Sequence, residues 1–314
     1  MLISGSMRNI LDCIGNTSLL PLRRVVPQNG ARILLKLESE NPSGNMKDRM
    51  ALAMIEAAES DGRLKPGGCV VEYTGGSTGV SLSLVCAVKG YPLHIVSSDA
   101  FAREKLDHMR ILGAKLQVIA SDGGRITEKL TKDMIEAARV IAEQTGAFWT
   151  DQLKNADQLI AYRKLGEEIW AQTDGRIDGF VQCVGTSASL RGTAQALRGH
   201  NQNLRVVAVE PAESPVLAGG KTGAHKIEGI GAGFVVPLWR KEIVDQIEHV
   251  STDEAMAMTM RLAREEGIFA GTSTGANVVA ALRVAEKFGR DATIVTIMVD
   301  TGMKYLKTYG AALS

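Results

Sequence analysis

Short runs of apolar, often β-branched residues alternate along the chain with longer segments whose apolar positions recur every three to four residues. The short runs predict buried strands, and the longer segments predict amphipathic helices. The predicted strands are 33–38, 69–73, 93–97, 116–119, 180–184, 206–210 and 293–299. The predicted helices are 46–61, 80–88, 101–112, 126–144, 155–172, 190–198, 252–266 and 275–288. This alternation indicates βαβ units, and therefore an α/β fold with mainly parallel sheets.

The length and net charge of the chain limit which classes of function are possible for it. The chain has 314 residues, which predicts about two domains. Its 36 basic and 35 acidic side chains give a net charge of +1, which argues against nucleic-acid or membrane partners. No apolar stretch approaches the ~18 residues of a membrane span, no secretory signal is visible, and four widely spaced cysteines show no metal or disulfide pattern. We expect a soluble, cytoplasmic globular protein.

A lysine stands where the first turn of a helix is expected. In segment 41–49, Pro42 and Gly44 favour a tight turn, and Asn45 is the candidate N-cap that would place Lys47 at the helix start. The helix dipole disfavours a cation there, and burial would lower its pKa further, leaving the free amine that Schiff-base chemistry requires. On this segment alone, a solvated surface lysine is the simpler explanation.

Three loops before predicted helices are rich in glycine and hydroxyl residues. They are Thr74-Gly75-Gly76-Ser77-Thr78-Gly79, Gly185-Thr186-Ser187-Ala188-Ser189 and Gly271-Thr272-Ser273-Thr274-Gly275. Backbone amides and hydroxyls at a helix start can bind a carboxylate or a phosphate. Three such loops, together with a lysine at a helix start, predict a ligand with more than one anionic group.

A serine hydrolase is the second hypothesis that these segments leave open. Both 75–79 and 271–275 match the G-x-S-x-G pattern of a hydrolase nucleophile. All five histidines precede Ser273, whereas an α/β hydrolase needs its histidine after the serine, so only Ser77 remains a candidate. Segment 215–222 fails as a P-loop because a proline stands at its first glycine position, and no dinucleotide fingerprint follows a strand.

Together with other segments, these loops resemble the cysteine synthase (O-acetylserine sulfhydrylase) family of fold type II pyridoxal-phosphate (PLP) enzymes. The matching segments keep the family's order: 14–17, 36–38 with 41–49, 210–217, 225–233, 266–268 with 271–276, and 300–302 with 305–306. The resemblance implies two three-layer α/β domains of the tryptophan synthase β type, with PLP in the cleft between them. A larger domain (1–46 and 151–314) would bind the cofactor phosphate, and a smaller one (47–150) the substrate carboxylate.

The resemblance also implies a role for each site residue, and it implies no metal. Lys47 would hold PLP as a Schiff base and act as the catalytic base. The cofactor phosphate would lie on Gly185, Thr186, Ser187, Ala188 and Ser189. Thr301 would face the pyridine nitrogen, and its neighbour Asp300 is the alternative residue for that position. The substrate carboxylate would be held by Thr74, Gly75, Gly76, Ser77, Thr78 and Gln152, and Ser77 would also contact the cofactor.

The implied reaction is lyase-like β-elimination followed by replacement on an activated serine, through an aminoacrylate intermediate. The leading expectation is cysteine biosynthesis, in which O-acetylserine and sulfide give L-cysteine and acetate. Formation of cystathionine or diaminopropionate is the alternative. Because the family is usually homodimeric, we expect a homodimer. A serine acetyltransferase is a possible partner, but none of the matching segments supports it.

Three departures from the family pattern bear on the substrate. Ser77 stands where the family has Asn, and because a serine makes fewer hydrogen bonds than an amide, substrate preference would change. Ser187 and Ala188 replace two glycines of the phosphate loop, so either the backbone avoids positive φ there or the loop shifts. Lys154, near Gln152, would favour an acidic or phosphorylated substrate unless it is a solvated surface lysine.

Overall fold

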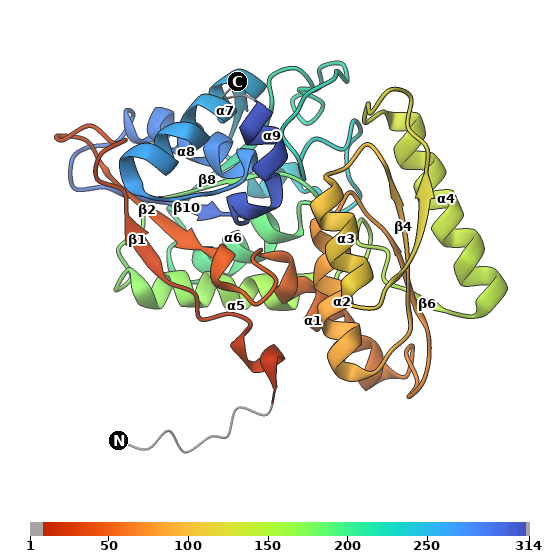
Figure 1. Cartoon of the computed structure of the whole chain (residues 1–314). Helices are drawn as coiled ribbons and strands as arrows, with labels where there is room; N and C mark the ends of the chain where they lie inside the picture. Colours follow the sequence, from red (N-terminus) through yellow and green to blue (C-terminus); the bar gives the residue numbers. More distant parts are fainter. Residues whose placement is uncertain (1–8, 312–314) are drawn as a thin grey trace.

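Two mainly parallel sheets, each lying between helices, form the framework of the chain (Figure 1). The computed structural model describes residues 9–311. The larger sheet has the strand order β1-β2-β10-β7-β8-β9, in which β1 pairs antiparallel with β2. The smaller sheet has the order β5-β4-β3-β6 and is parallel throughout. The predicted α/β class with mainly parallel sheets is therefore confirmed.

The strands and helices have well-defined bounds. The larger sheet contains β1 (Leu19–Pro21), β2 (Arg32–Leu37), β7 (Gly179–Cys183), β8 (Arg205–Pro211), β9 (Gln246–Val250) and β10 (Thr293–Met298). The smaller sheet contains β3 (Val70–Tyr73), β4 (Leu93–Ser98), β5 (Lys115–Ile119) and β6 (Phe148–Trp149). The helices are α1 (Lys47–Asp61), α2 (Ser77–Lys89), α3 (Arg103–Ile111), α4 (Glu128–Thr145), α5 (Gln158–Gln172), α6 (Ala188–His200), α7 (Thr252–Arg261), α8 (Thr272–Ala285) and α9 (Leu306–Ala311).

Helices cover both faces of each sheet. On the larger sheet, α6 with α5 packed against it covers one face, and α8 with α7 packed against it covers the other (Figure 1). On the smaller sheet, α4 covers one face while α2 and α3 cover the other. Helix α1 packs against both α2 and α5, so it joins the two halves. Within residues 9–311, no helix has the length and apolarity needed to cross a membrane.

Strands buried on both faces explain why the core has two parts. Every residue of β7 and of β10 is buried, as expected when helices cover both sides of a parallel sheet. Successive side chains point to opposite faces, so Phe180 packs into one core and Val181 into the other. The core that contains Phe180 continues through Met50 and Met54 of α1 to Val70 of the smaller sheet. The part of the core that contains Phe180 is therefore continuous between the two sheets.

All seven predicted strands and all eight predicted helices form. The unpredicted elements are β1, β6, β9 and α9. Two of them, β1 and β6, have only three and two residues, too few to show a hydrophobic period. The predicted start of α2 at 80 is wrong, because the helix begins at Ser77 directly after Gly76, whose φ is 140°. Helix α8 likewise begins at Thr272 rather than at 275.

The division into a larger domain (1–46 and 151–314) and a smaller one (47–150) stays a prediction. The distribution of strands supports it, because all four strands of the smaller sheet lie between Val70 and Trp149. The strands of the larger sheet come from both sides of that segment.

Candidate active site

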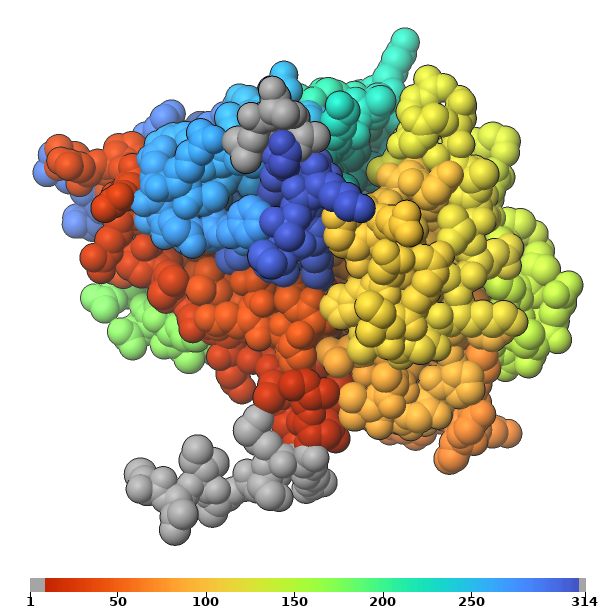
Figure 2. All heavy atoms as spheres, in the orientation of Figure 1, coloured from red at the N-terminus to blue at the C-terminus, as the bar shows by residue number. Residues whose placement is uncertain are grey.

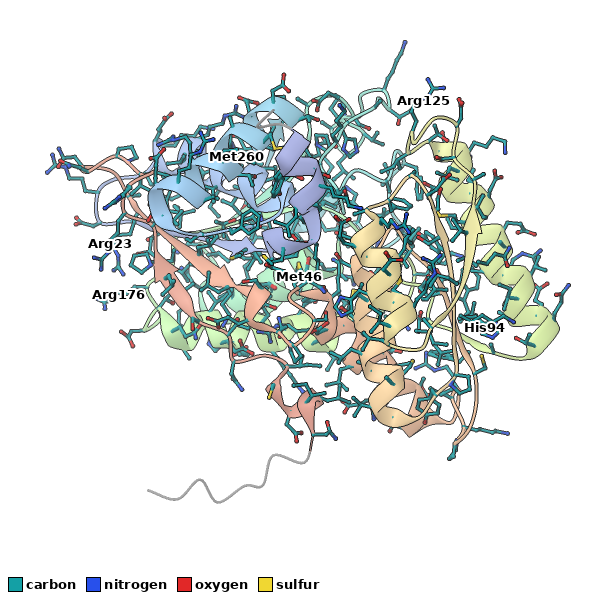
Figure 3. The ribbon with its side chains drawn as sticks, viewed as in Figure 1. Arg23, Met46, His94, Arg125, Arg176 and Met260 are labelled. Carbon is teal, nitrogen blue, oxygen red and sulfur yellow. The ribbon has the colours of Figure 1, made fainter. Side chains whose placement is uncertain are left out.

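A cavity of about 190 Å³ lies where connections from the two sheets meet. Its lining includes Lys47, residues 74–78 after β3, Gln152 after β6, and Gly185 and Thr186 after β7. These segments follow the carboxyl ends of parallel strands, where ligands bind in such sheets. Met46, the residue before Lys47, lies between the two halves of the molecule in Figure 3. The cavity is therefore positioned by both halves.

Lys47 is the first residue of α1, and its side chain lines the cavity. The prediction that Asn45 is the N-cap is wrong, because that position belongs to Met46. The Asn45 side chain nevertheless accepts a hydrogen bond from the backbone N of Lys47 at 2.7 Å. Burial lowers the pKa of Lys47 from 10.5 to about 8, although the charge of Asp300 acts in the opposite direction. Part of the amine is therefore unprotonated, and nucleophilic, near neutral pH.

The loop between β3 and α2 lies on one side chain just before α3 and on another within its first turn. A Cβ atom on Gly75 would be 2.7 Å from the ring of Phe101, and one on Gly76 would collide with the side chain of Lys105. Gly76 also has a φ of 140°, which side chains rarely tolerate. Glycines at both positions thus let the loop pack directly against Phe101 and Lys105.

A chain of hydrogen bonds connects this loop to the loop after β7. Thr78 Oγ1 donates to Gln152 Oε1 at 2.8 Å, and Gln158 Nε2 donates to the Gln152 carbonyl at 2.6 Å. Thr186 Oγ1 then donates to Gln158 Oε1 at 3.2 Å. The structure therefore brings Thr78, Gln152 and Thr186 together, as their proposed roles require. Gln158 was not predicted, because one polar residue near the start of a helix carries no distinguishing signal.

The loop of residues 185–189 precedes helix α6 and could hold a phosphate. A Cβ atom on Gly185 would lie 2.5 Å from the carbonyl oxygen of Gly229, so no side chain fits there. Ser187 has a φ of 72°, so the idea that its backbone avoids positive φ is wrong. A non-glycine residue in this conformation costs about 1–2 kcal/mol. The N–H groups of the first turn of α6 follow directly, and amides at a helix start can bind an anion.

Other predicted site residues lie outside the cavity lining. Ser187, Ala188 and Ser189 are buried at the start of α6, where Ser189 Oγ accepts a hydrogen bond from Gln182 at 2.7 Å. Thr301 Oγ1 accepts a hydrogen bond from the backbone N of Met303 at 3.3 Å.

The carboxylate of Asp300 is buried beside these residues. Tyr305 OH donates to Asp300 Oδ2 at 2.6 Å, and Oδ1 has no hydrogen-bond partner among residues 9–311. The buried amine of Lys47 suits the aldehyde of PLP, and Gly185 with the start of α6 suits its phosphate. The residues present therefore fit this cofactor.

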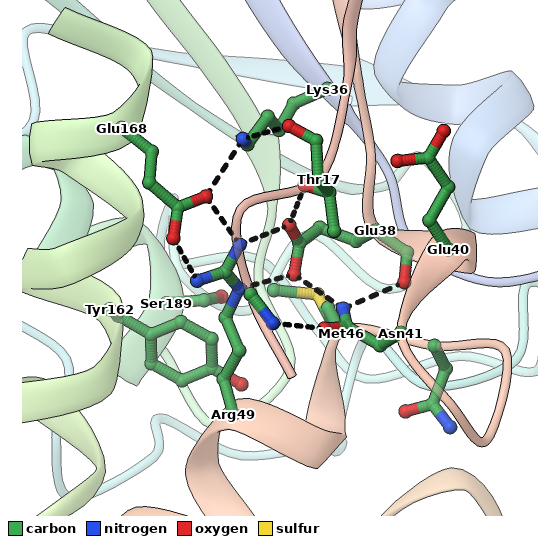
Figure 4. Close-up of polar contacts among 12 residues, drawn as sticks. Thr17, Lys36, Glu38, Glu40, Asn41, Met46, Arg49, Tyr162, Glu168 and Ser189 are labelled. Carbon is green, nitrogen blue, oxygen red and sulfur yellow. Dashed lines mark hydrogen bonds and ion pairs between the residues drawn. The ribbon is translucent and has the colours of Figure 1, made fainter. Parts of the chain in front are cut away.

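A buried ion network holds the helix that carries Lys47 (Figure 4). Arg49 Nε donates to Glu38 Oε2 at 2.6 Å, and Arg49 Nη1 donates to Glu168 Oε1 at 2.7 Å. Lys36 Nζ also donates to Glu168, at 2.8 Å. Burial favours the neutral acid, but Arg49 and Lys36 outweigh it and lower the pKa of Glu168 to about 2. The network therefore fixes α1 to β2 and α5 through paired charges.

The histidine that lines this cavity is not available as a catalytic base. His225 lines it, but the backbone N of Ile227 donates to Nδ1 at 3.3 Å, and Nε2 lies 3.1 Å from the carbonyl oxygen of Gly231. Both ring nitrogens are thus occupied, so His225 cannot serve as the base for Ser77. Among residues 9–311, no group of three or more His, Cys, Asp or Glu could hold a metal ion.

Lys154 lies away from the cavity lining. Its side chain is 66% exposed, with its Nζ 3.4 Å from Asp151 Oδ2. The same Nζ lies 5.9 Å from the centre of the Trp149 ring. The structure favours the solvated-lysine alternative over a role in substrate binding.

Known proteins resemble this chain over nearly its whole length. A family model described as "Pyridoxal-phosphate dependent enzyme" matches residues 10–300. A cysteine synthase of Staphylococcus aureus (strain Mu50 / ATCC 700699) is 40% identical over 302 residues, which are 96% of each chain. The crystal structure of a cysteine synthase (OASS) from Entamoeba histolytica has a TM-score of 0.91 at 37% identity, covering 98% of this chain and 91% of that one. An O-ureido-L-serine synthase has a TM-score of 0.90 at 35% identity, covering 96% and 94%.

Proposed function

The chain belongs to the family of pyridoxal-phosphate dependent enzymes, and on this basis we propose that it is a cysteine synthase that makes L-cysteine and acetate from O-acetylserine and sulfide. The observation that carries the proposal is the meeting of Lys47 with two glycine loops in one cavity. The serine hydrolase hypothesis is replaced by this family assignment. It would also leave Lys47 unused and Ser77 without a base.

Residues that line the cavity and residues next to it each have a role in binding or proton transfer. When bound, pyridoxal phosphate supplies the electron sink for bonds at the substrate Cα. Lys47 holds the cofactor and removes the Cα proton, for which a pKa of about 8 suits it. Residues 185–189 with the start of α6 hold the phosphate, and Thr301, or Asp300 in its place, faces the pyridine nitrogen. Residues 74–78 with Gln152 hold the substrate carboxylate.

Another β-replacement is the second candidate, because the cavity extends beyond the loops that would hold the cofactor and the substrate carboxylate. Its lining continues past residues 74–78 to Ile126, Thr127 and Thr131 around the start of α4. A nucleophile that carries its own side chain, as in cystathionine or diaminopropionate formation, would occupy that part. The similar O-ureido-L-serine synthase is named for a product other than cysteine.

We further propose that the enzyme is a homodimer that acts in the cytoplasm. All four cysteines are free thiols, as in reducing compartments. A groove between α1 and α5 is lined by apolar residues, among them Leu52, Ala53 and the 48% exposed Ile160, and by the charged residues Arg49, Glu56 and Lys164. Such a patch on a helix pair is a candidate subunit contact. Light scattering coupled to size-exclusion chromatography tests it, and a monomer at micromolar concentration would contradict it.

The test of the function is product formation by the PLP-loaded protein. We expect L-cysteine and acetate to form in equal amounts from O-acetylserine and sulfide, and turnover to vanish without PLP. If O-acetylserine is consumed only when an amine or a thiol amino acid replaces sulfide, the second candidate is correct. No turnover of any activated serine would contradict both candidates.

A further inference from the structure

A buried lysine connects the carboxylate-binding loop to the opposite half of the molecule. Lys105 lies in α3, lines the cavity and has a side chain only 3% exposed. Its methylene groups lie against Gly76, and Phe101, which precedes the helix, lies against Gly75. The start of α3 and the loop after β3 therefore form one packed unit, and a shift of one requires a shift of the other.

The charged end of this side chain reaches across to residues outside the smaller sheet. Lys105 Nζ donates to Glu228 Oε2 at 2.6 Å and to Tyr305 OH at 3.0 Å, and it lies 4.4 Å from the centre of the Tyr305 ring. Tyr305 OH in turn donates to Asp300 Oδ2 at 2.6 Å. In Figure 2, the blue C-terminal segment contacts the yellow segment that contains α3. The contacts thus run from Gly76 to the carboxylate whose charge acts on Lys47.

We call the contacts of Lys105 with Gly76, Glu228 and Tyr305 a clamp, because breaking them costs free energy. A buried ammonium group that loses its partners leaves an uncompensated charge, which is strongly unfavourable. Helix α3 therefore cannot move away from Glu228 and Tyr305 while the ammonium group stays out of water. The loop that lies on Lys105 is held at a fixed distance from the Lys47 side of the cavity.

We propose that Lys105 is a positioning residue, which holds residues 74–78 so that a substrate carboxylate bound there presents its Cα to Lys47. This inference rests on the proposed function, because it assumes that an amino-acid substrate binds through this loop. Lys105 does not itself touch the substrate in this proposal. Its effect is on substrate affinity rather than on the chemical step.

The first test compares Lys105→Met with Arg103→Met in the PLP-loaded enzyme. Arg103 is on the same helix but is 77% exposed, and its partner Asp107 is also exposed. We expect Lys105→Met to raise KM for O-acetylserine roughly ten- to hundredfold, as for a lost hydrogen bond to a charged group, with a smaller change in kcat. Lys105→Arg should recover part of the loss. Equal effects of the two Met variants, or an unchanged KM in Lys105→Met, would overturn the proposal.

A second measurement separates this inference from the function itself. Amide hydrogen exchange of residues 74–79 in the PLP-loaded protein without substrate should be at least about tenfold faster in Lys105→Met than in Arg103→Met. Tyr305→Phe removes the hydroxyl that accepts from Lys105 and donates to Asp300, but it keeps the ring beside Lys105. This variant should give an intermediate rate. If the wild type does not turn over O-acetylserine, the proposed function fails, while the exchange rates still test the clamp. Unchanged exchange in Lys105→Met would overturn it.

Discussion

Lys47 combines two properties that a surface lysine lacks. It stands at the start of a helix, and its amine lies in a cavity where burial lowers its pKa from 10.5 to about 8. Burial is the larger cause of the pKa shift, so the environment of the cavity creates the reactive amine. Asp300 limits the shift, because a nearby negative charge favours the protonated form.

The lowered pKa predicts how fast the cofactor-free protein takes up PLP at each pH. Only the unprotonated amine attacks an aldehyde, so the loading rate should rise with pH, reach half its maximum near pH 8 and level off above it. Stopped-flow absorbance of the bound cofactor between about pH 6 and pH 10 measures this, since that range brackets the lowered value. Lys47→Ala should show no covalent uptake. A midpoint near the ordinary 10.5 would mean that the amine is not desolvated.

Ser77 is the residue at which we expect substrate preference to be set. It is the first residue of α2 and lines the cavity, but its hydroxyl has fewer hydrogen-bonding groups than the amide that the cysteine synthase family has there. Ser77→Asn should raise kcat/KM for O-acetylserine about tenfold relative to other activated serines, which is the value of about one hydrogen bond. Competition between two activated serines in one assay measures the ratio. An unchanged ratio would show that preference is set elsewhere.

At the scale of elements, helix α1 carries both the reactive lysine and the buried ion network. Arg49 follows Lys47 by two residues and bonds to Glu38 at the end of β2 and to Glu168 of α5. Charges buried in this way contribute little net stability as a pair. The loss of one partner, however, leaves a charge that neither water nor protein compensates. The network therefore determines where α1 can lie.

Arg49→Met should lower the free energy of unfolding by about 3–5 kcal/mol, because it leaves Glu38 and Glu168 without their shared partner. Urea unfolding near pH 7 measures the change. Arg63→Met, which removes a 43% exposed arginine, is the matched control and should cost less than about 1 kcal/mol. The pKa of Glu168 is about 2 rather than 4.5, so its contribution is fully present above about pH 4.5 and is lost as the pH falls toward 2. A decrease of less than about 1 kcal/mol in Arg49→Met would show that the buried ion network does not hold α1 in place.

The elements that the sequence predicts are those with a clear hydrophobic pattern, either a continuous apolar run or a helical period. Strands such as β10, buried along its whole length, and the long helices α4 and α5 came from hydrophobic pattern alone. The starts of α2 and α8 were placed three residues late, because Gly, Ser and Thr at a helix start are equally typical of a loop. The positive φ of Ser187 was also unforeseen, since it depends on the packing of the loop and not on residue type.

At the scale of the whole molecule, the cavity lies where the rule for parallel sheets places it, at the carboxyl ends of strands. Lys47, Thr78, Gln152 and Thr186 could be named from the sequence because motifs surround them. Lys105 could not, because a lysine in a helical pattern looks the same whether it is solvated or buried. Only its contact with Glu228, 123 residues away, reveals the difference.

The continuous core predicts that the two sheets unfold together. Met50 and Met54 of α1 connect the core beneath the smaller sheet to that beneath α5 and α6, so neither half can expose its apolar surface alone. Trp149 lies in the smaller sheet, whereas Trp239 is buried in the larger half. Fluorescence of each tryptophan can therefore follow one half of the molecule.

Two variants test this cooperativity, one retaining only Trp149 and the other only Trp239, with phenylalanine at the remaining tryptophan positions. In each, urea unfolding followed by fluorescence should coincide with unfolding followed by far-ultraviolet circular dichroism, which reports the helices of both halves. Coincidence is expected because separating the halves would expose the shared core to water at about 25 cal/mol per Å². If the Trp149 signal were lost at lower urea than the helical signal, the smaller sheet would be an independent unit. Helix α1 would then connect the two halves without coupling their stability.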